Sequence, residues 1–183
     1  MSSNRGGKER KSAEKKPAIS ILLIDDHELV RIGLKKILEF ERDFEVIGEA
    51  GEGEAGVRLV EEKDPDVVLL DLNLGGPTNG FDVCRRIARC GRKARVIVLT
   101  IYDQETYRRE AALAGAVGYL LKDVSGEELA ETIRAVVAGE NLLEKEALVE
   151  GPTLAEIRER MDSLTERERQ VLEKILEGLS NKE

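Results

Sequence analysis

Length, composition and charge exclude several classes of protein at the outset. A chain of 183 residues can form one domain of about 100 to 150 residues together with a smaller piece. Its 29 Lys and Arg against 37 Asp and Glu give a net charge of −8, so any contact with nucleic acid must be local. There is no run of about 18 apolar residues and no apolar secretory signal, so we expect an intracellular protein that contacts no membrane.

The two cysteines, Cys84 and Cys90, lie six positions apart. That spacing is not typical of a metal site, and nothing in the sequence indicates a secreted protein. We therefore expect two free thiols in a reducing compartment, with neither a disulfide nor zinc.

The first segment, residues 1–17, differs in composition from the rest of the chain. It contains six Lys and Arg against two Glu, and only Met1 and Ala13 are apolar. Such a segment cannot bury enough surface to offset the entropy of ordering it. We expect a disordered basic tail, and an arm that binds a partner is the alternative.

Short apolar runs recur from residue 18 onward. Three are continuous rather than alternating, which is typical of strands buried on both faces of a parallel sheet: Ile19 to Ile24, Val67 to Leu70 and Val96 to Leu99. Two weaker runs, Phe44 to Ile47 and Val117 to Leu121, complete a predicted set of five strands.

Helical patterns lie between these runs. Two of them have apolar residues at positions i, i+4, i+7 and i+8, namely Val30, Leu34, Ile37 and Leu38, and then Leu129, Ile133, Val136 and Val137. Ser125 and Glu128 predict a capping box at the start of the last helix, and Gly91, Gly115 and Gly139 stand where C-terminal caps are expected. Alternating strands and helices over residues 18–139 predict a doubly wound α/β domain with a five-stranded parallel sheet.

Polar residues follow the predicted strands at their carboxyl ends, which is where such a sheet forms its functional crevice. They are Asp25 and Asp26, Asp71, Thr100 and, beyond Tyr119 in the last strand, Lys122. Three carboxylates at one edge would repel each other unless a cation neutralises them, and oxygen ligands favour Mg²⁺. A nucleophilic carboxylate beside Mg²⁺, a lysine and a hydroxyl is suited to accepting a phosphoryl group.

These residues carry a resemblance to a known family. Asp25 and Asp26, Asp71, Thr100 and the segment Gly118 to Lys122 resemble the flavodoxin-like receiver domain of bacterial two-component response regulators, over residues 18–140. The stretches DDHELVR, from Asp25, and AGENL, from Ala138, are similar to the NarL/FixJ class.

The resemblance implies a role for each carboxylate. Asp71 would take the phosphoryl group from a phosphohistidine of a sensor histidine kinase. Asp26 and Asp71 would bind Mg²⁺, together with the backbone carbonyl of Asn73, and Asp25 would bind it directly or through water. The protein would then be a cytoplasmic phosphoacceptor and switch rather than a turnover enzyme.

The resemblance also implies a switch. Lys122 would hold a phosphoryl oxygen, and Thr100 would hydrogen-bond the phosphoryl group once it has formed. Tyr119 would turn from an exposed to a buried position as Thr100 moves. His27, the only histidine, is interpreted as a local turn or helix-start residue rather than a phosphotransfer group.

One loop departs from the family pattern. Where a Met-Pro-Gly turn is usual after the phosphoacceptor strand, the chain has Leu74 to Gly80 (LGGPTNG), one residue longer and with the proline displaced. Two adjacent glycines make this loop permissive, and the change bears on phosphorylation kinetics and Mg²⁺ affinity.

Two alternatives remain at this point. One is a receiver-like interaction module that binds its partner without phosphorylation, which the altered loop keeps open. The other is a Mg²⁺-dependent phosphatase of the haloacid dehalogenase type. That chemistry wants a second Asp two positions after the nucleophile, where this chain has Asn73.

The final segment changes character after residue 140. We expect a linker with a helix over 141–163, opened by a capping box at Thr153 and Glu156, that packs on the receiver or pairs with a second copy of the chain.

Residues 164–183 begin with a second box, at Thr165 and Glu168, and resemble the opening of a LuxR-type helix-turn-helix domain. The resemblance implies control of transcription. Because the DNA recognition helix is not in this sequence and residues 151–183 hold six Lys and Arg against eight acids, we expect no DNA binding by this chain itself.

Overall fold

The computed structural model describes residues 18–76, 78–148 and 151–170. The predicted disordered tail, Pro77 of the lengthened loop and the predicted helix-turn-helix residues from Val171 onward lie outside the described residues. None of the described helices is long and apolar enough to cross a membrane.

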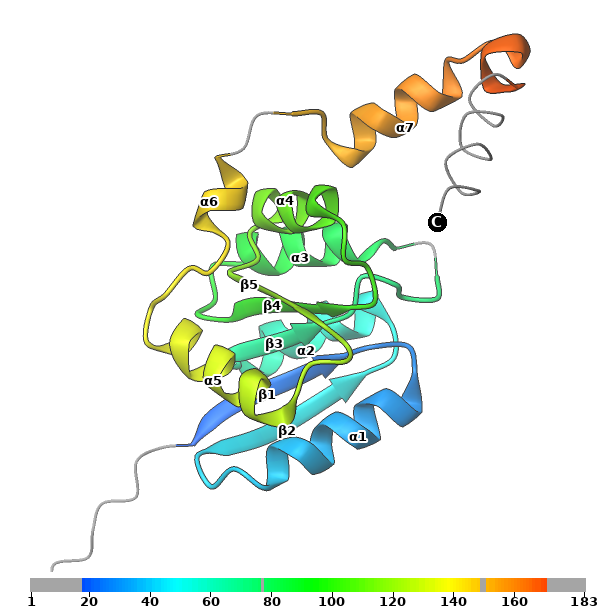
Figure 1. The fold of residues 1–183 in the computed structure, drawn as a ribbon. Coiled ribbons are helices and arrows are strands. Elements are labelled where there is room, and N and C mark those ends of the chain that lie inside the picture. The colour runs from blue at the N-terminus through cyan, green and yellow to red at the C-terminus, as the bar shows by residue number, and fades with distance from the viewer. Residues whose placement is uncertain (1–17, 77, 149–150, 171–183) are drawn as a thin grey trace, which may run out of the picture.

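A five-stranded parallel sheet forms the centre of the molecule, in the order β2-β1-β3-β4-β5 (Figure 1). The strands are β1 (Ile19–Ile24), β2 (Phe44–Ala50), β3 (Val67–Leu70), β4 (Arg95–Thr100) and β5 (Gly118–Leu121). This is the flavodoxin-like strand order, so the predicted fold class is confirmed.

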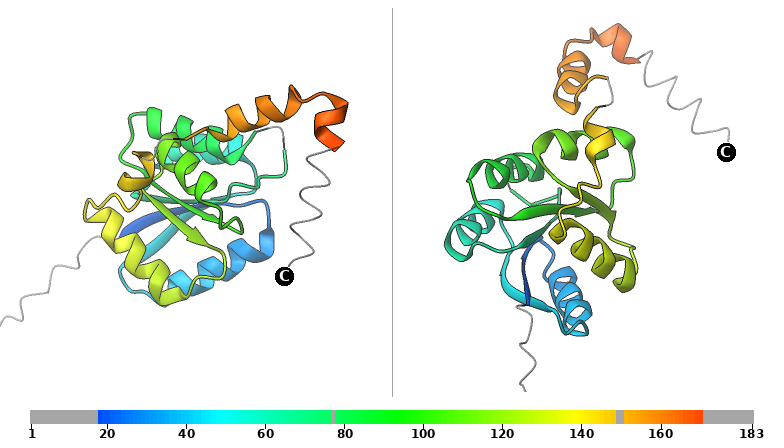
Figure 2. Two further views of the ribbon diagram at one scale, coloured as in Figure 1. Left: turned by 45° about the horizontal axis from the view of Figure 1, so that its top comes forward. Right: turned by 90° about the vertical axis from the view of Figure 1, so that its left-hand side faces the viewer.

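Helices cover both faces of the sheet (Figure 2). Five of them connect or follow the strands: α1 (Glu28–Glu39), α2 (Gly53–Lys63), α3 (Gly80–Arg89), α4 (Glu105–Ala114) and α5 (Gly126–Val137). α1 and α5 share one hydrophobic core with the sheet, and α2, α3 and α4 share the other. The central strands contribute to both cores, which explains why their sequences are continuous apolar runs.

The predicted helix ends are confirmed. Ser125 caps α5 by accepting a hydrogen bond from the Glu128 backbone N–H. Gly91, Gly115 and Gly139 have φ angles of 71°, 98° and 107°, the left-handed conformation that favours glycine after a helix.

The second strand is longer than predicted. The apolar run predicts Phe44 to Ile47, whereas β2 continues through Gly48 and Glu49 to Ala50. Its register against β1 shifts between Ile21 and Leu22. β2 lies at the edge of the sheet, where backbone pairing with β1 extends a strand that side-chain hydrophobicity does not mark.

The linker returns from α5 to α4. Leu143 is buried in the core beneath α4, and the short helix α6 (Glu144–Ala147), which the sequence did not predict, follows it.

α7 (Leu154–Asp162) begins at the predicted capping box, where both reciprocal hydrogen bonds of Thr153 and Glu156 are present. A further helix begins at Glu166, where Thr165 and Glu168 also make reciprocal hydrogen bonds.

Both cysteines lie on or beside α3 and are free thiols, as predicted. Cys84 is fully buried, and burial raises its pKa to about 12. Cys90, which caps the end of α3, is half-buried, and its thiol donates a hydrogen bond to the carbonyl of Ile87.

Candidate functional site

The carboxyl ends of the parallel strands bring three of the predicted site residues into contact. Asp25 directly follows β1, Asp71 follows β3 and Lys122 follows β5. Lys122 Nζ lies 2.7 Å from Asp25 Oδ2 and 2.7 Å from Asp71 Oδ2. An ammonium group therefore bridges two buried carboxylates that are 46 positions apart in sequence (71 − 25).

Burial and ion pairing have opposite effects on the two partners of this bridge. Burial raises the pKa of Asp71, and the hydrogen bonds from Lys122 and the Asn73 backbone only partly oppose it. For Lys122, burial lowers the pKa, but the hydrogen bonds to Asp25 and Asp71 outweigh it, so the pKa is raised overall. Lys122 thus stays charged, while Asp71 is a carboxylate held in surroundings that disfavour its negative charge.

Asp26 occupies the outer part of the same cluster. Its Oδ2 accepts a hydrogen bond from the Gly75 backbone N–H at 3.0 Å. Its Oδ1 lies 2.6 Å from His27 Nδ1, yet this oxygen is buried and has no hydrogen-bond partner among the described residues. His27 is the N-cap residue of α1, as interpreted from sequence, and its backbone N–H donates to Asp25 Oδ1 at 2.8 Å.

The acidic cluster fits a hard divalent cation. Ligand atoms of Asp25, Asp26, His27 and Asp71 all lie within 4.8 Å of one another. Three carboxylates grouped this closely form the oxygen-rich set that Mg²⁺ prefers. The sequence did not predict that the His27 side chain lies beside the carboxylates. A histidine that follows two aspartates is as typical of a helix start as of a metal site.

The lengthened loop contributes directly to this cluster. A Cβ placed on Gly75 would lie 2.9 Å from Asp26 Oδ2, whereas one placed on Gly76 would meet nothing within 4 Å. Gly75 is therefore required for close approach of the loop to Asp26, while Gly76 is not. The sequence indicated only that the two glycines make the loop permissive.

Thr100 is the last residue of β4 and is fully buried. Its hydroxyl oxygen has no hydrogen-bond partner in the part of the chain that the structure describes. A buried hydroxyl without a partner is costly, so an unpartnered one at the edge of a functional cluster indicates a group that bonds to something else in another state.

Tyr119 lies in β5, buried beside α4. Its hydroxyl donates a hydrogen bond of 2.7 Å to the Tyr102 carbonyl, and the Arg108 guanidinium lies 4.9 Å from its ring centroid. Burial raises the pKa of Tyr119 well above its usual value. Of the two positions expected for Tyr119, exposed and buried, the structure shows the buried one.

Sequence reasoning missed an aromatic cluster next to Tyr119. The Tyr102 ring stacks on Tyr107 at 4.6 Å between centroids, and Tyr107 lies 5.9 Å from Phe81, the second residue of α3. The chain has three tyrosines and three phenylalanines, and two of these tyrosines and Phe81 form the cluster. The composition alone, with so few aromatics, could have drawn attention to them.

The fold and the acidic cluster define a receiver domain, and comparison with known proteins agrees. Residues 21–134 match the response regulator receiver domain family, and residues 162–183 match the bacterial regulatory proteins of the luxR family. The chain therefore belongs to the response regulators of two-component systems and has both a receiver domain and a LuxR-type region. This membership contradicts the haloacid dehalogenase alternative.

Curated relatives are NarL-like transcription regulators. The chain is 43% identical to transcriptional regulatory protein LiaR of Bacillus subtilis (strain 168) over 171 residues, which cover 90% of this chain and 80% of LiaR. It is 40% identical to nitrate/nitrite response regulator protein NarL of Escherichia coli (strain K12), over 89% of this chain and 77% of NarL. Proteins of this kind are regulators and not classical enzymes.

Two solved structures of response regulators are also similar to this chain. A two-component response regulator of the LuxR family from Aurantimonas sp. SI85-9A1 is 32% identical, with a TM-score of 0.65 over 78% of this chain and 97% of that one. Response regulator ChrA of a heme-sensing two-component system is 34% identical, with a TM-score of 0.60 over 91% of this chain and 79% of that one.

Proposed function

We propose that Asp71 is the phosphoacceptor of this response regulator and that a sensor histidine kinase is the donor. The observation that carries the proposal is the buried bridge of Lys122 to Asp71 and Asp25 at 2.7 Å each. An oxygen of Asp71 forms the new bond to phosphorus as the bond from phosphorus to the donor histidine breaks, and the imidazole nitrogen keeps that electron pair and takes up a proton. The burial that raises the pKa of Asp71 also strips water from the attacking carboxylate.

Asp25, Asp26, Asp71 and the backbone carbonyl of Asn73 would hold the Mg²⁺ cofactor of this step. The closeness of the three carboxylates supports this assignment. When bound, Mg²⁺ supplies positive charge that neutralises the phosphoryl oxygens during transfer. The Gly75 N–H keeps the Asp26 carboxylate facing the cluster.

Lys122 and Thr100 bind the phosphoryl group after transfer. Lys122 already contacts Asp71 Oδ2, so its ammonium is within reach of an oxygen on a phosphoryl group attached there. The unpartnered hydroxyl of Thr100 gains a hydrogen bond from that group. Thr100 and Tyr119 are the switch residues, because Tyr119 ties β5 to Tyr102, two residues after Thr100.

The output of the proposed switch is control of transcription through the LuxR-type domain of the family, which contacts DNA. The activity is limited to self-catalysed phosphotransfer and dephosphorylation, and it takes place in the cytoplasm. Formation of a homodimer on phosphorylation is a further proposed output, which sedimentation of the phosphorylated and unphosphorylated protein tests.

Intact-mass analysis after incubation with Mg²⁺ and acetyl phosphate tests the site. We expect a gain of one phosphoryl group in the wild type and none in Asp71→Asn. The matched variant Asp123→Asn changes an exposed carboxylate one position beyond Lys122 and retains the gain. A wild type that binds Mg²⁺ but gains no mass favours a phosphorylation-independent interaction module, and labelling that persists in Asp71→Asn contradicts the assignment.

A further inference from the structure

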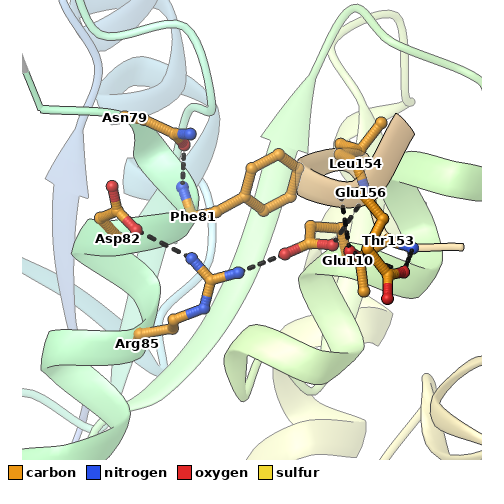
Figure 3. Close-up of polar contacts among 8 residues, drawn as sticks. All are labelled: Asn79, Phe81, Asp82, Arg85, Glu110, Thr153, Leu154 and Glu156. Atoms are coloured by element: carbon orange, nitrogen blue, oxygen red, sulfur yellow. Dashed lines mark hydrogen bonds and ion pairs between the residues drawn. The ribbon is translucent and has the colours of Figure 1, made fainter. Parts of the chain in front are cut away.

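A buried carboxylate lies outside the acidic cluster, on α4. Glu110 is 5% exposed, and its Oε1 forms an ion pair with Nη2 of Arg85 on α3 (Figure 3). Arg85 also contacts Asp82 at 2.8 Å. A carboxylate with so little access to water needs partners for both of its oxygens. One partner is therefore Arg85, and the second comes from another part of the chain.

The second partner is the first residue of α7. The Leu154 backbone N–H donates to Glu110 Oε2 at 3.4 Å. The first N–H groups of a helix have no partner within it, and the helix start carries partial positive charge, so a carboxylate is a suitable acceptor. The Leu154 side chain packs against the core shared by α3 and α4. A polar and an apolar contact therefore hold the same residue.

Beyond this contact, α7 stands above a groove. The groove has a volume of about 760 Å³, with the lengthened loop and residues of α3 and α4 on one side and α7 on the other. Phe81, Tyr102 and Tyr107 line the receiver side, and Ile157 and Met161 line the α7 side. Met161 is 51% exposed, so α7 is docked mainly through its first turn.

We propose that Glu110, positioned by Arg85, is a latch that holds the linker helix α7 over the lengthened loop through the Leu154 N–H. The bond is long for an N–H···O hydrogen bond, so this latch is readily released. A helix of nine residues is marginal alone in water, so release of its first turn also favours unfolding of α7. The latch goes beyond the proposed phosphorylation and does not require it.

The aromatic cluster connects this latch to the switch. Tyr119 bonds the Tyr102 carbonyl, the Tyr102 ring stacks on Tyr107, and Tyr107 lies three residues before Glu110 on α4. Displacement of Tyr119 thus removes a support of the turn of α4 that bears Glu110. This coupling rests on the proposed switch role of Tyr119, whereas the latch itself rests on Glu110, Arg85 and Leu154.

Hydrogen–deuterium exchange of the full chain tests the latch. Glu110→Met keeps a side chain of similar length and good helix propensity but has no oxygen, and Glu105→Met makes the same change at an exposed position of α4. We expect amides of residues 153–162 to exchange about threefold faster in Glu110→Met, because a long hydrogen bond contributes less than a typical one, and at the wild-type rate in Glu105→Met. Equal rates in α7 for both variants overturn the latch.

A second pair of variants leaves Glu110 intact. Leu154→Pro and Leu154→Ala both lose the leucine side chain, but only proline also removes the N–H, and the first helical position tolerates proline. Faster exchange of α7 in Leu154→Pro than in Leu154→Ala supports the latch even if Glu110→Met disturbs the receiver, and equal exchange contradicts it. Tyr119→Phe tests the coupling separately: faster exchange of α7 supports it, and no change overturns the coupling alone.

Discussion

Two charged side chains with limited access to water, Lys122 and Glu110, are held in different ways at different places in the fold. Lys122 lies at the carboxyl ends of the strands, where β1, β3 and β5 fix it between two carboxylates at 2.7 Å each. Glu110 lies between helices, where one oxygen meets Arg85 and the other meets the Leu154 N–H at 3.4 Å. The first cluster is fixed by the sheet, and the second depends on a linker helix.

This difference indicates which contact of the receiver can be broken at the lower cost in free energy. Moving Lys122 away from both carboxylates would leave two buried carboxylates without the cation that they share, which costs several kcal/mol. Releasing Leu154 would break one long hydrogen bond and expose part of one leucine. We therefore expect a change of conformation to cost less at the α4–α7 contact than at the bridge of Lys122 to Asp25 and Asp71.

Removing Lys122 has the largest expected effect. Lys122→Ala leaves Asp25 and Asp71 buried and unpaired, so we expect the free energy of unfolding without Mg²⁺ to fall by about 3 kcal/mol. Added Mg²⁺ restores part of that loss, because a cation again neutralises the carboxylates. Urea denaturation with and without Mg²⁺ measures both effects.

The control for this prediction is an exposed lysine. Lys35→Ala removes a lysine that is 45% exposed and lies 3.4 Å from Glu49, so we expect a loss of about 0.5 kcal/mol or less. If Lys122→Ala and Lys35→Ala lower the free energy of unfolding by similar amounts, the bridge of Lys122 to Asp25 and Asp71 is no more firmly held than a surface ion pair.

The two glycines of the lengthened loop test whether the cluster has a fixed shape. Gly75→Ala places a methyl group against Asp26 Oδ2 and displaces the loop N–H, so we expect Mg²⁺ affinity to fall on the order of tenfold. Gly76→Ala faces open space and leaves the affinity unchanged. Isothermal titration with Mg²⁺ measures both variants, and equal affinities would show that Asp26 is free to move.

Thr100→Val tests the buried hydroxyl at the end of β4. Valine has nearly the shape of threonine but no hydroxyl, and the Thr100 hydroxyl is buried without a partner in the described part of the chain. We expect the unphosphorylated protein to gain about 1 kcal/mol of stability, while the conformational response to phosphorylation is lost. A lower melting temperature for Thr100→Val would show that the hydroxyl is already bonded.

The smallest expected effect is the pH dependence of Asp71. Its pKa is raised in the folded state, so the ionised carboxylate opposes folding at pH values above that raised pKa. The penalty fades as pH falls through the raised pKa and is absent below the unfolded value. Without Mg²⁺, we expect Asp71→Asn to be more stable than the wild type at neutral pH, with the difference shrinking as the buffer is acidified. A constant difference in denaturation midpoint across this range would contradict the raised pKa.

Much of the fold could be predicted from sequence because parallel strands are marked by continuous apolar runs. The prediction matched the ends of β1 and β3, which are central and pair on both sides. It missed the last three residues of β2, where backbone pairing at the sheet edge rather than hydrophobicity extends the strand. α6 escaped prediction because it is a single turn without buried residues.

The candidate site was predictable to the extent that it follows the strands. Asp25, Asp71 and Lys122 meet because parallel strands end at one edge, which is a topological consequence. Glu110 could not be predicted, since a glutamate within a charged helix is typical of a solvated residue, and its burial arises only when α3 and α7 pack on either side. Gly75 likewise depends on a loop path that spacing does not define.

The two thiols of α3 also differ in chemical reactivity. Burial and a raised pKa leave Cys84 without accessible thiolate at neutral pH, whereas Cys90 at the end of the same helix is half-buried. A maleimide reagent therefore modifies Cys90 in preference to Cys84 in the native protein. Cys90 is therefore a suitable attachment point for a fluorophore. With a second dye on α7, the distance between the two dyes can be measured in solution, and both native cysteines are retained.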